Sequence, residues 1–95
     1  MKNYEIAEDD GKIVGYCLGF DHYTFYANGR VSWVEEIMVE ESYRNKGIGA
    51  KLMNSVEEWS ETRESKLVAL ATRRAVPFYK ALDYVESASY FRKLL

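Results

Sequence analysis

A short segment with two glycines carries the clearest chemical pattern in the sequence. It reads Arg44-Asn45-Lys46-Gly47-Ile48-Gly49-Ala50 and stands between a β-prone run and an amphipathic stretch. Backbone N–H groups at the start of a helix lack hydrogen-bond partners and lie at the positive end of the helix dipole, so they favour phosphate. Gly47 and Gly49 have no Cβ, which lets the backbone close around a pyrophosphate. Arg44 and Lys46 would add positive charge beside it.

The same glycines are also compatible with a plain turn, and two familiar phosphate-binding motifs are absent. The Walker loop requires Gly-Lys-Ser/Thr after a four-residue gap, and the dinucleotide fingerprint requires a third glycine. This segment has neither. Its interpretation as a phosphate site therefore depends on the elements that surround it.

The first half of the chain predicts three strands. Residues 3–8 and 12–20 read as a hairpin joined by the turn residues Asp9-Asp10-Gly11-Lys12. On the second strand the small residues Gly15, Cys17 and Gly19 fall on one face, where a helix or a ligand could approach the backbone closely. Residues 31–39 are β-prone and apolar on both faces, which predicts a central strand covered on both sides.

The second half of the chain predicts two helices and two further strands. Residues 48–62 form the first helix, with an apolar stripe of Ile48, Leu52, Val56 and Trp59. Residues 66–72 read as a short buried strand that pairs in parallel with the central one. A second helix over 74–82 and a last strand over 85–92 complete the order β-β-β-α-β-α-β. We expect one α/β domain with a mixed sheet over residues 1–95.

Two segments resemble the signatures of a single family. Residues 33–53, with Arg-x-x-Gly-x-Gly at 44–49 between a strand and a helix, resemble the acyl-CoA motif of the GNAT superfamily of N-acetyltransferases. Residues 75–84 resemble its second signature, Ala-x-x-Phe-Tyr-x-x-x-Gly-Phe, with Asp83 in the place of the glycine. The resemblance implies a GNAT-like acyl-CoA N-acyltransferase fold in a short form, in which the family's first strand and two following helices have no counterpart.

The resemblance also implies how a cofactor would bind. Acetyl-CoA would be the co-substrate, and no metal would be required. The backbone of Ile37, Met38 and Val39 would pair with the pantetheine arm like an added strand. Arg73 would contact the CoA 3′-phosphate, or else cap the strand end or remain solvated. The pyrophosphate cradle would consist of Arg44, Asn45, Lys46, Gly47, Ile48, Gly49 and Ala50.

Three residues are the candidate catalytic groups under this resemblance. Tyr79 matches the family tyrosine that protonates or hydrogen-bonds the departing CoA thiolate, although an aromatic on this stripe could also serve packing alone. Glu35 and Glu36 lie on the central strand beside the expected thioester, where either could deprotonate the acceptor amine. Polyamine-type members carry a glutamate at the position of Glu35. Strict alternation places these two glutamates on opposite faces, and a strand bulge would exchange the faces.

Three other readings of these residues remain open. Either glutamate could be a substrate contact or a paired structural acid. His22, the only histidine, is a further candidate proton acceptor. Cys17 is expected to lie in the core rather than to act as a nucleophile, because direct transfer needs no acyl-enzyme.

Composition argues against several classes of protein. The formal net charge is −2 and the sequence pI about 5.4, so the chain lacks the basic excess of a nucleic-acid-binding protein. Its single cysteine excludes an internal disulfide and suggests a reducing compartment. The sequence shows neither the apolar run of a signal peptide nor a segment of membrane-spanning length. We expect a cytoplasmic protein without a membrane or nucleic-acid partner.

The expected activity is direct transfer of an acetyl group from acetyl-CoA to a primary amine within a ternary complex. The acceptor would be a small-molecule or peptide amine that the sequence does not specify. The alternative is a non-catalytic acyl-CoA-binding or sensing module that acts on a protein partner. We also expect a homodimer, with the first hairpin and residues 23–26 as the contact surface, in which the partner supplies part of the acceptor-site wall.

Overall fold

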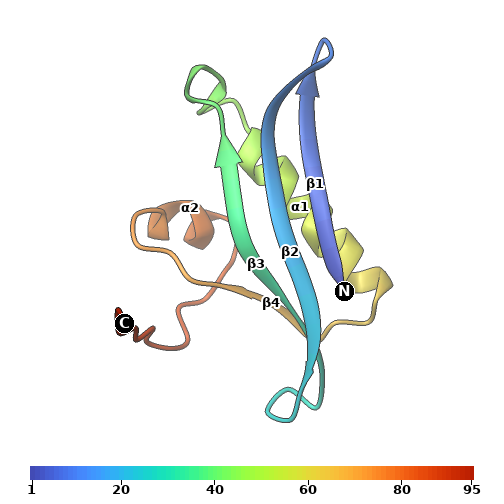
Figure 1. Ribbon diagram of the computed structural model, residues 1–95, viewed down its shortest axis with the longest axis vertical. Helices are drawn as coiled ribbons and strands as arrows, with labels where there is room; N and C mark the ends of the chain where they lie inside the picture. The colour runs from blue at the N-terminus through green and yellow to red at the C-terminus, as the bar shows by residue number, and fades with distance from the viewer.

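The computed structural model describes all of residues 1–95, and its centre is a four-stranded mixed sheet (Figure 1). The strands lie in the order β1-β2-β3-β4, with antiparallel pairing among the first three and parallel pairing between β3 and β4. In chain order the elements are β1 (Lys2–Asp9), β2 (Lys12–Thr24), β3 (Gly29–Val39), the 3-10 turn η1 (Glu41–Tyr43), α1 (Ile48–Thr62), β4 (Leu67–Leu70) and α2 (Val76–Ala81). No helix is both long enough and apolar enough to cross a bilayer.

The first hairpin has the turn that the sequence predicts. Asp10 and Gly11 have φ angles of 52° and 83°, the left-handed values that a tight two-residue hairpin turn requires. Strand β2 continues to Thr24, four residues beyond the predicted end at 20. Asp21, an acidic residue within this extension, is buried.

The core lies between the sheet and its two helices. Cys17 and Val34 from the sheet meet Leu52, Met53 and Val56 from α1 and Tyr79 from α2 in one buried cluster. The small-residue face of β2 makes this approach possible, as expected. A Cβ on Gly15 would lie 3.0 Å from the Met38 carbonyl oxygen and 3.4 Å from Leu52 Cδ1.

The prediction that the central strand is covered on both sides is confirmed only for its first half. Val31 and Ser32 point to opposite faces and are each 1% exposed, whereas Glu36 and Met38 are exposed. Both helices contribute to the single core on one face. Figure 1 shows α1 behind the strands, so that the opposite face is turned to the viewer. Apolar side chains on that face remain accessible, among them Tyr4 at 62% and Ile6 at 54% exposure. We refer to it as the open face, which by the pairing register carries Tyr4, Ile6, Tyr16, Leu18, Phe20, Trp33, Glu36 and Met38.

The predicted last strand over residues 85–92 is wrong. After α2 the chain turns at Asp83, whose φ of 69° shows that aspartate adopts the left-handed conformation there, and it then follows an irregular course to Leu95. Val85 and Phe91 are 84% and 90% exposed. Composition alone favoured a strand, but a strand needs a paired neighbour, and β4 pairs only with β3.

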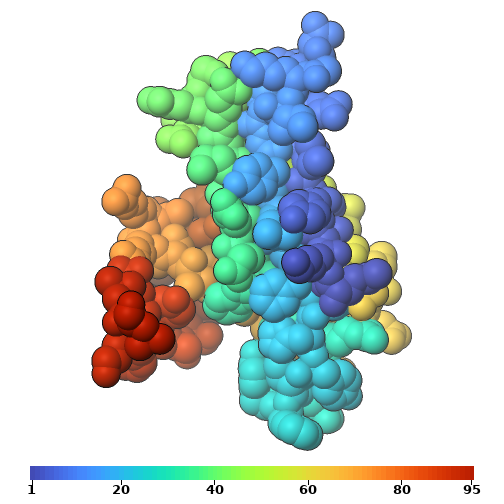
Figure 2. All heavy atoms as spheres, in the orientation of Figure 1, coloured from blue at the N-terminus to red at the C-terminus, as the bar shows by residue number.

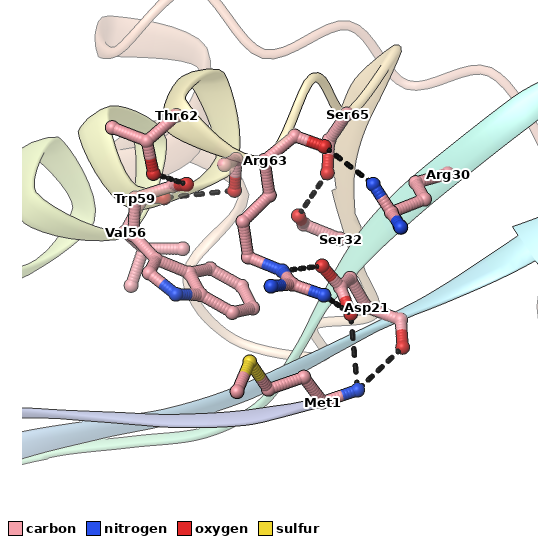
Figure 3. Close-up of polar contacts among 10 residues, drawn as sticks. Met1, Asp21, Arg30, Ser32, Val56, Trp59, Thr62, Arg63 and Ser65 are labelled. Carbon is pink, nitrogen blue, oxygen red and sulfur yellow. Dashed lines mark hydrogen bonds and ion pairs between the residues drawn. The ribbon is translucent and has the colours of Figure 1, made fainter.

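An ion pair between Arg63, at the end of α1, and the buried Asp21 of β2 connects the helix to the sheet (Figure 3). The Arg63 guanidinium donates to both carboxylate oxygens of Asp21, whose side chain is 2% exposed, and the Met1 ammonium lies 3.0 Å from Asp21 Oδ1. Next to them, Ser32 and Ser65 share a hydrogen bond of 2.9 Å. The hydrogen bond from Arg63 is the main cause that lowers the pKa of the Asp21 carboxyl.

Candidate active site

The two parallel strands separate halfway along β3. Pairing joins Val31–Val34 of β3 to Leu67–Leu70 of β4 and goes no further, whereas β3 continues to Val39. Figure 1 shows β4 bending away toward α2 while β3 runs on toward η1. The β3 edge over residues 35–39 therefore has no neighbouring strand on its β4 side. An unpaired strand edge of this kind can pair with an extended ligand arm.

A β-bulge marks the point of separation. Gly19 pairs with Val34 and Leu18 pairs with Glu36, so Glu35 is the extra residue on β3. The bulge exchanges the faces of the residues that follow it on β3, which is the alternative to strict alternation that the sequence left open. Glu36 and Met38 consequently share the open face with Trp33, while Ile37 packs against the core with Val34.

The glycine-containing segment leads into α1 as predicted, with left-handed backbone at Asn45 (φ 62°) and Gly47 (φ 82°). Gly47 is the residue that caps α1, and no side chain caps the helix. The first helical hydrogen bond runs from Lys51 N to the Gly47 carbonyl, 3.1 Å apart, and the first turn contains no acidic residue. The N–H groups of residues 48–50 are thus available to an anion.

Gly49 also lies against Phe78 of α2, a contact that the sequence did not predict. A Cβ at this position would lie 3.2 Å from Phe78 Cζ. The missing side chain therefore allows α2 to approach the first turn of α1. Gly47 has open space around its Cα instead, and its requirement for glycine comes from its φ angle.

The side chains of Arg44 and Lys46 lie near the glycine-containing segment, where they were expected to add positive charge. Arg44 Nε donates to the Val39 carbonyl oxygen at 3.0 Å, which ties the segment to the end of β3. The Lys46 ammonium lies 5.4 Å from the centre of the Tyr43 ring. Both side chains are exposed. The positive charge therefore lies at the same end of β3 as the free N–H groups of α1.

Tyr79 lies in the buried cluster on the inner side of α2. It is 7% exposed and stands edge-on to the rings of Phe78 and Tyr84, with ring centres 4.9 and 5.8 Å away. Burial is the main cause that raises the pKa of the Tyr79 hydroxyl above its ordinary value of about 10, so the group is protonated at neutral pH. The Tyr84 hydroxyl donates to Glu57 at 2.7 Å, but the Tyr79 hydroxyl has no such partner. It remains available as a donor.

The two glutamates of β3 are exposed and each accepts one hydrogen bond. Trp33 Nε1 donates to Glu35 Oε2 at 3.0 Å, and the Tyr16 hydroxyl donates to Glu36 Oε1 at 2.6 Å. The second bond is the main reason that the pKa of Tyr16 is raised. Sequence reasoning missed the contributions of Trp33 and Tyr16.

A pocket of about 260 Å³ opens where the strands separate. Its walls bring Glu35 together with Arg73, which follows β4, and with Tyr90 and Arg92 from the C-terminal segment. Figure 2 shows that segment gathered on the β4 and α2 side of the strands. Arg73, expected near the cofactor, is thus placed beside one of the candidate bases. Tyr90 and Arg92 were not anticipated, since residues 85–92 were expected to form a strand.

Comparison with known proteins assigns this arrangement to a family. Residues 3–84 match the family described as the acetyltransferase (GNAT) family. The chain belongs to this family. A thialysine N-epsilon-acetyltransferase from Bos taurus is 35% identical over 74% of the chain and 43% of that protein. An uncharacterised N-acetyltransferase from Archaeoglobus fulgidus is 31% identical over 82% of the chain and 56% of that protein.

Solved structures of acetyltransferases have the same fold. A putative acetyl transferase from Pyrococcus furiosus superposes with a TM-score of 0.91 at 21% identity, over 100% of this chain and 66% of that one. Glucosamine-6-phosphate N-acetyltransferase from Arabidopsis thaliana also reaches 0.91, at 18% identity, over 98% of this chain and 66% of its own. The GNAT fold predicted from the two signatures is confirmed. The chain spans about half the length of the curated relatives it matches.

Proposed function

We propose that this GNAT-family chain binds acetyl-CoA in the opening between β3 and β4 and transfers the acetyl group directly to a primary amine. The observation that carries the proposal is the separation of the two strands at the Glu35 bulge. Three features lie in this region: the unpaired edge of β3, a start of α1 that no side chain caps, and the buried Tyr79. Other members of the family use the same cofactor.

The residues around the opening suit the parts of acetyl-CoA. The edge formed by Ile37, Met38 and Val39 offers backbone groups to the pantetheine arm, and the N–H groups that start α1 suit the pyrophosphate. Gly47 has open space where a Cβ would stand, which leaves the backbone there accessible to the phosphates. Acetyl-CoA, when bound, supplies the acetyl group as a reactive thioester.

Glu35 would act as the general base of the reaction and Tyr79 as the general acid. The Glu35 carboxylate removes a proton from the acceptor ammonium, whose nitrogen then forms a bond to the acetyl carbon. The bond between that carbon and sulfur breaks, and the Tyr79 hydroxyl donates a proton to the departing sulfur. Glu36 is the alternative base, on the open face and already hydrogen-bonded to Tyr16.

A turnover assay tests the proposal. Purified protein is incubated with acetyl-CoA and a panel of small and peptide amines, and the release of free CoA thiol is followed. We expect thiol release that depends on both protein and amine. Binding of acetyl-CoA without release for any amine would instead support the second candidate function, a non-catalytic acyl-CoA-binding module, which the exposure of both glutamates favours.

We further propose that the protein forms a homodimer through the open face and the first hairpin. The end of β2 and the turn that follows it expose apolar side chains, with Tyr23 at 72% and Phe25 fully exposed. Exposed apolar faces of this kind are commonly covered by association. A partner on the open face would also enclose Glu36, and so complete one wall of the acceptor site.

A further inference from the structure

The pocket at the strand separation contains opposite charges that do not pair with each other. Glu35 lies in one wall, and Arg73 and Arg92 lie in the others. The ion pairs of the structure involve Asp21 and Glu40 and none of these three residues. Glu35 instead accepts its hydrogen bond from Trp33. The pocket therefore holds one negative and two positive groups that lie more than a salt-bridge distance apart.

This separation sets a requirement on what the pocket binds. A ligand with only an ammonium group would be attracted by Glu35 and repelled by the two guanidinium groups. A ligand with an ammonium group and a nearby anionic group would satisfy both, because arginine binds carboxylates and phosphates through paired N–H groups. Trp33 and Tyr90 offer aromatic surface to the carbon chain between the two charges.

We infer that the acceptor amine carries a carboxylate or a phosphate, with its amine at Glu35 and its anionic group at Arg73 and Arg92. The inference rests on the proposed function, because it assigns the acceptor to the same site. It favours amino acids and phosphorylated amines as acceptors over polyamines and other amines without an anionic group. Arg73 and Arg92 act as specificity residues and take no part in proton transfer.

The test uses pairs of amines that differ only in the anionic group. Lysine is compared with 1,5-diaminopentane, and phosphoethanolamine with ethanolamine, by calorimetric titration into protein saturated with CoA. We expect at least one anionic amine to bind about tenfold more tightly than its partner, as for one charged hydrogen-bonded contact. Arg73→Gln and Arg92→Gln should each remove that preference. Lys93→Gln removes a neighbouring positive charge outside the pocket and should retain it.

Three results would overturn the inference: equal binding within both pairs, a preference that survives either pocket variant, or a preference that Lys93→Gln also removes. The pair that shows the difference distinguishes a carboxylate from a phosphate. Turnover is measured separately with the same four amines. A binding preference without thiol release from any amine would refute the proposed transfer reaction, whereas release from all four at equal rates would refute the anionic acceptor and leave the transfer reaction standing.

Discussion

Tyr79 and Cys17 show how burial determines the chemistry of single residues. Both belong to the same buried cluster. Burial raises the pKa of the Cys17 thiol to about 11, so this fully enclosed sulfur stays neutral and unreactive, in keeping with its predicted place in the core. The Tyr79 hydroxyl is protonated at neutral pH as any tyrosine is, and burial raises its pKa further, so it retains a proton that it can donate. The same environment thus makes one group inert and leaves the other able to act.

We predict that Tyr79→Phe lowers kcat by roughly 100-fold while the Kd for acetyl-CoA changes little, because the hydroxyl acts on the leaving group. Steady-state kinetics and calorimetry provide the two measurements. The variant keeps the ring that packs against Phe78, so its unfolding free energy serves as the folding control. Equal turnover in both proteins would make Tyr79 a packing residue.

The bulge residue Glu35 provides a second prediction. Glu35→Gln should reduce the rate by roughly 100-fold and alter the acidic limb of the pH–rate profile, because an amide cannot accept the ammonium proton. Glu36→Gln is the matched control on the neighbouring position and should leave that limb in place. If the limb is unchanged in Glu35→Gln, the base is Glu36, His22 or a water chain.

At the scale of elements, the start of α1 and the inner side of α2 are coupled through Gly49. This glycine lies in the expected cradle and also against Phe78. A larger residue would therefore have two separate effects, one on the ligand and one on packing between the helices. The two can be distinguished by experiment because Phe78 is not part of the cradle.

We predict that Gly49→Val weakens acetyl-CoA binding by about tenfold, because a side chain would block the approach of the pyrophosphate. The variant should also lose stability through its contact with Phe78. Adding Phe78→Leu relieves that contact and should restore part of the unfolding free energy without restoring affinity. Recovery of full affinity in the double variant, measured by calorimetry, would remove the cradle from the mechanism.

The link between β2 and the end of α1 depends on the Asp21–Arg63 pair. Asp21→Asn should lower the unfolding free energy by about 2 kcal/mol, because it leaves a partly buried guanidinium without its counter-charge. Asp10→Asn, an exposed aspartate in a turn that asparagine also tolerates, is the control and should have little effect. Urea denaturation measures both changes.

The Asp21–Arg63 pair also makes the free energy of unfolding depend on pH, in a direction that follows from the lowered pKa of Asp21. The folded-state pKa of Asp21 lies below the value in the unfolded chain, so its contribution to stability is complete above the ordinary carboxyl pKa of about 4. It declines as the pH falls through the lowered folded value. The stability difference between the parent chain and Asp21→Asn should therefore narrow below about pH 4. A difference that does not depend on pH would argue against the ion pair as its source.

At the scale of the whole molecule, the most consequential feature is the uncovered open face. Both helices lie on the other side of the sheet, and the open face keeps accessible aromatic and aliphatic side chains beside Glu36. Any group that covers this face also changes the surroundings of a candidate base. Association and activity are therefore expected to depend on each other.

We predict a dimer in light scattering across a dilution series, with activity that falls as the dimer dissociates. Ile6→Glu on the open face should shift the equilibrium to the monomer, because it places a charge on the covered surface. Val85→Glu, at a position that is 84% exposed and outside the sheet, is the control. A monomer that remains folded and active at nanomolar concentration would refute both the dimer and the shared wall.

The sequence by itself determined the elements whose signals are local. The period of the apolar stripe predicted α1, the turn residues Asp9-Asp10-Gly11-Lys12 predicted the first hairpin turn, and two short signatures predicted the family. Each of these depends on residues that are close together in the chain. Backbone geometry and side-chain period therefore fix them before any long-range contact forms.

Only the tertiary structure decided which side chains meet. The Glu35 bulge determined which face each glutamate occupies, because one extra residue exchanges the faces of a strand. Residues 85–92 have the composition of a strand but lack a partner, so Tyr90 and Arg92 line a pocket instead. Asp21 ends up buried because Arg63, 42 positions away, lies against it. Contacts between distant residues depend on how the whole chain packs, which no local pattern encodes.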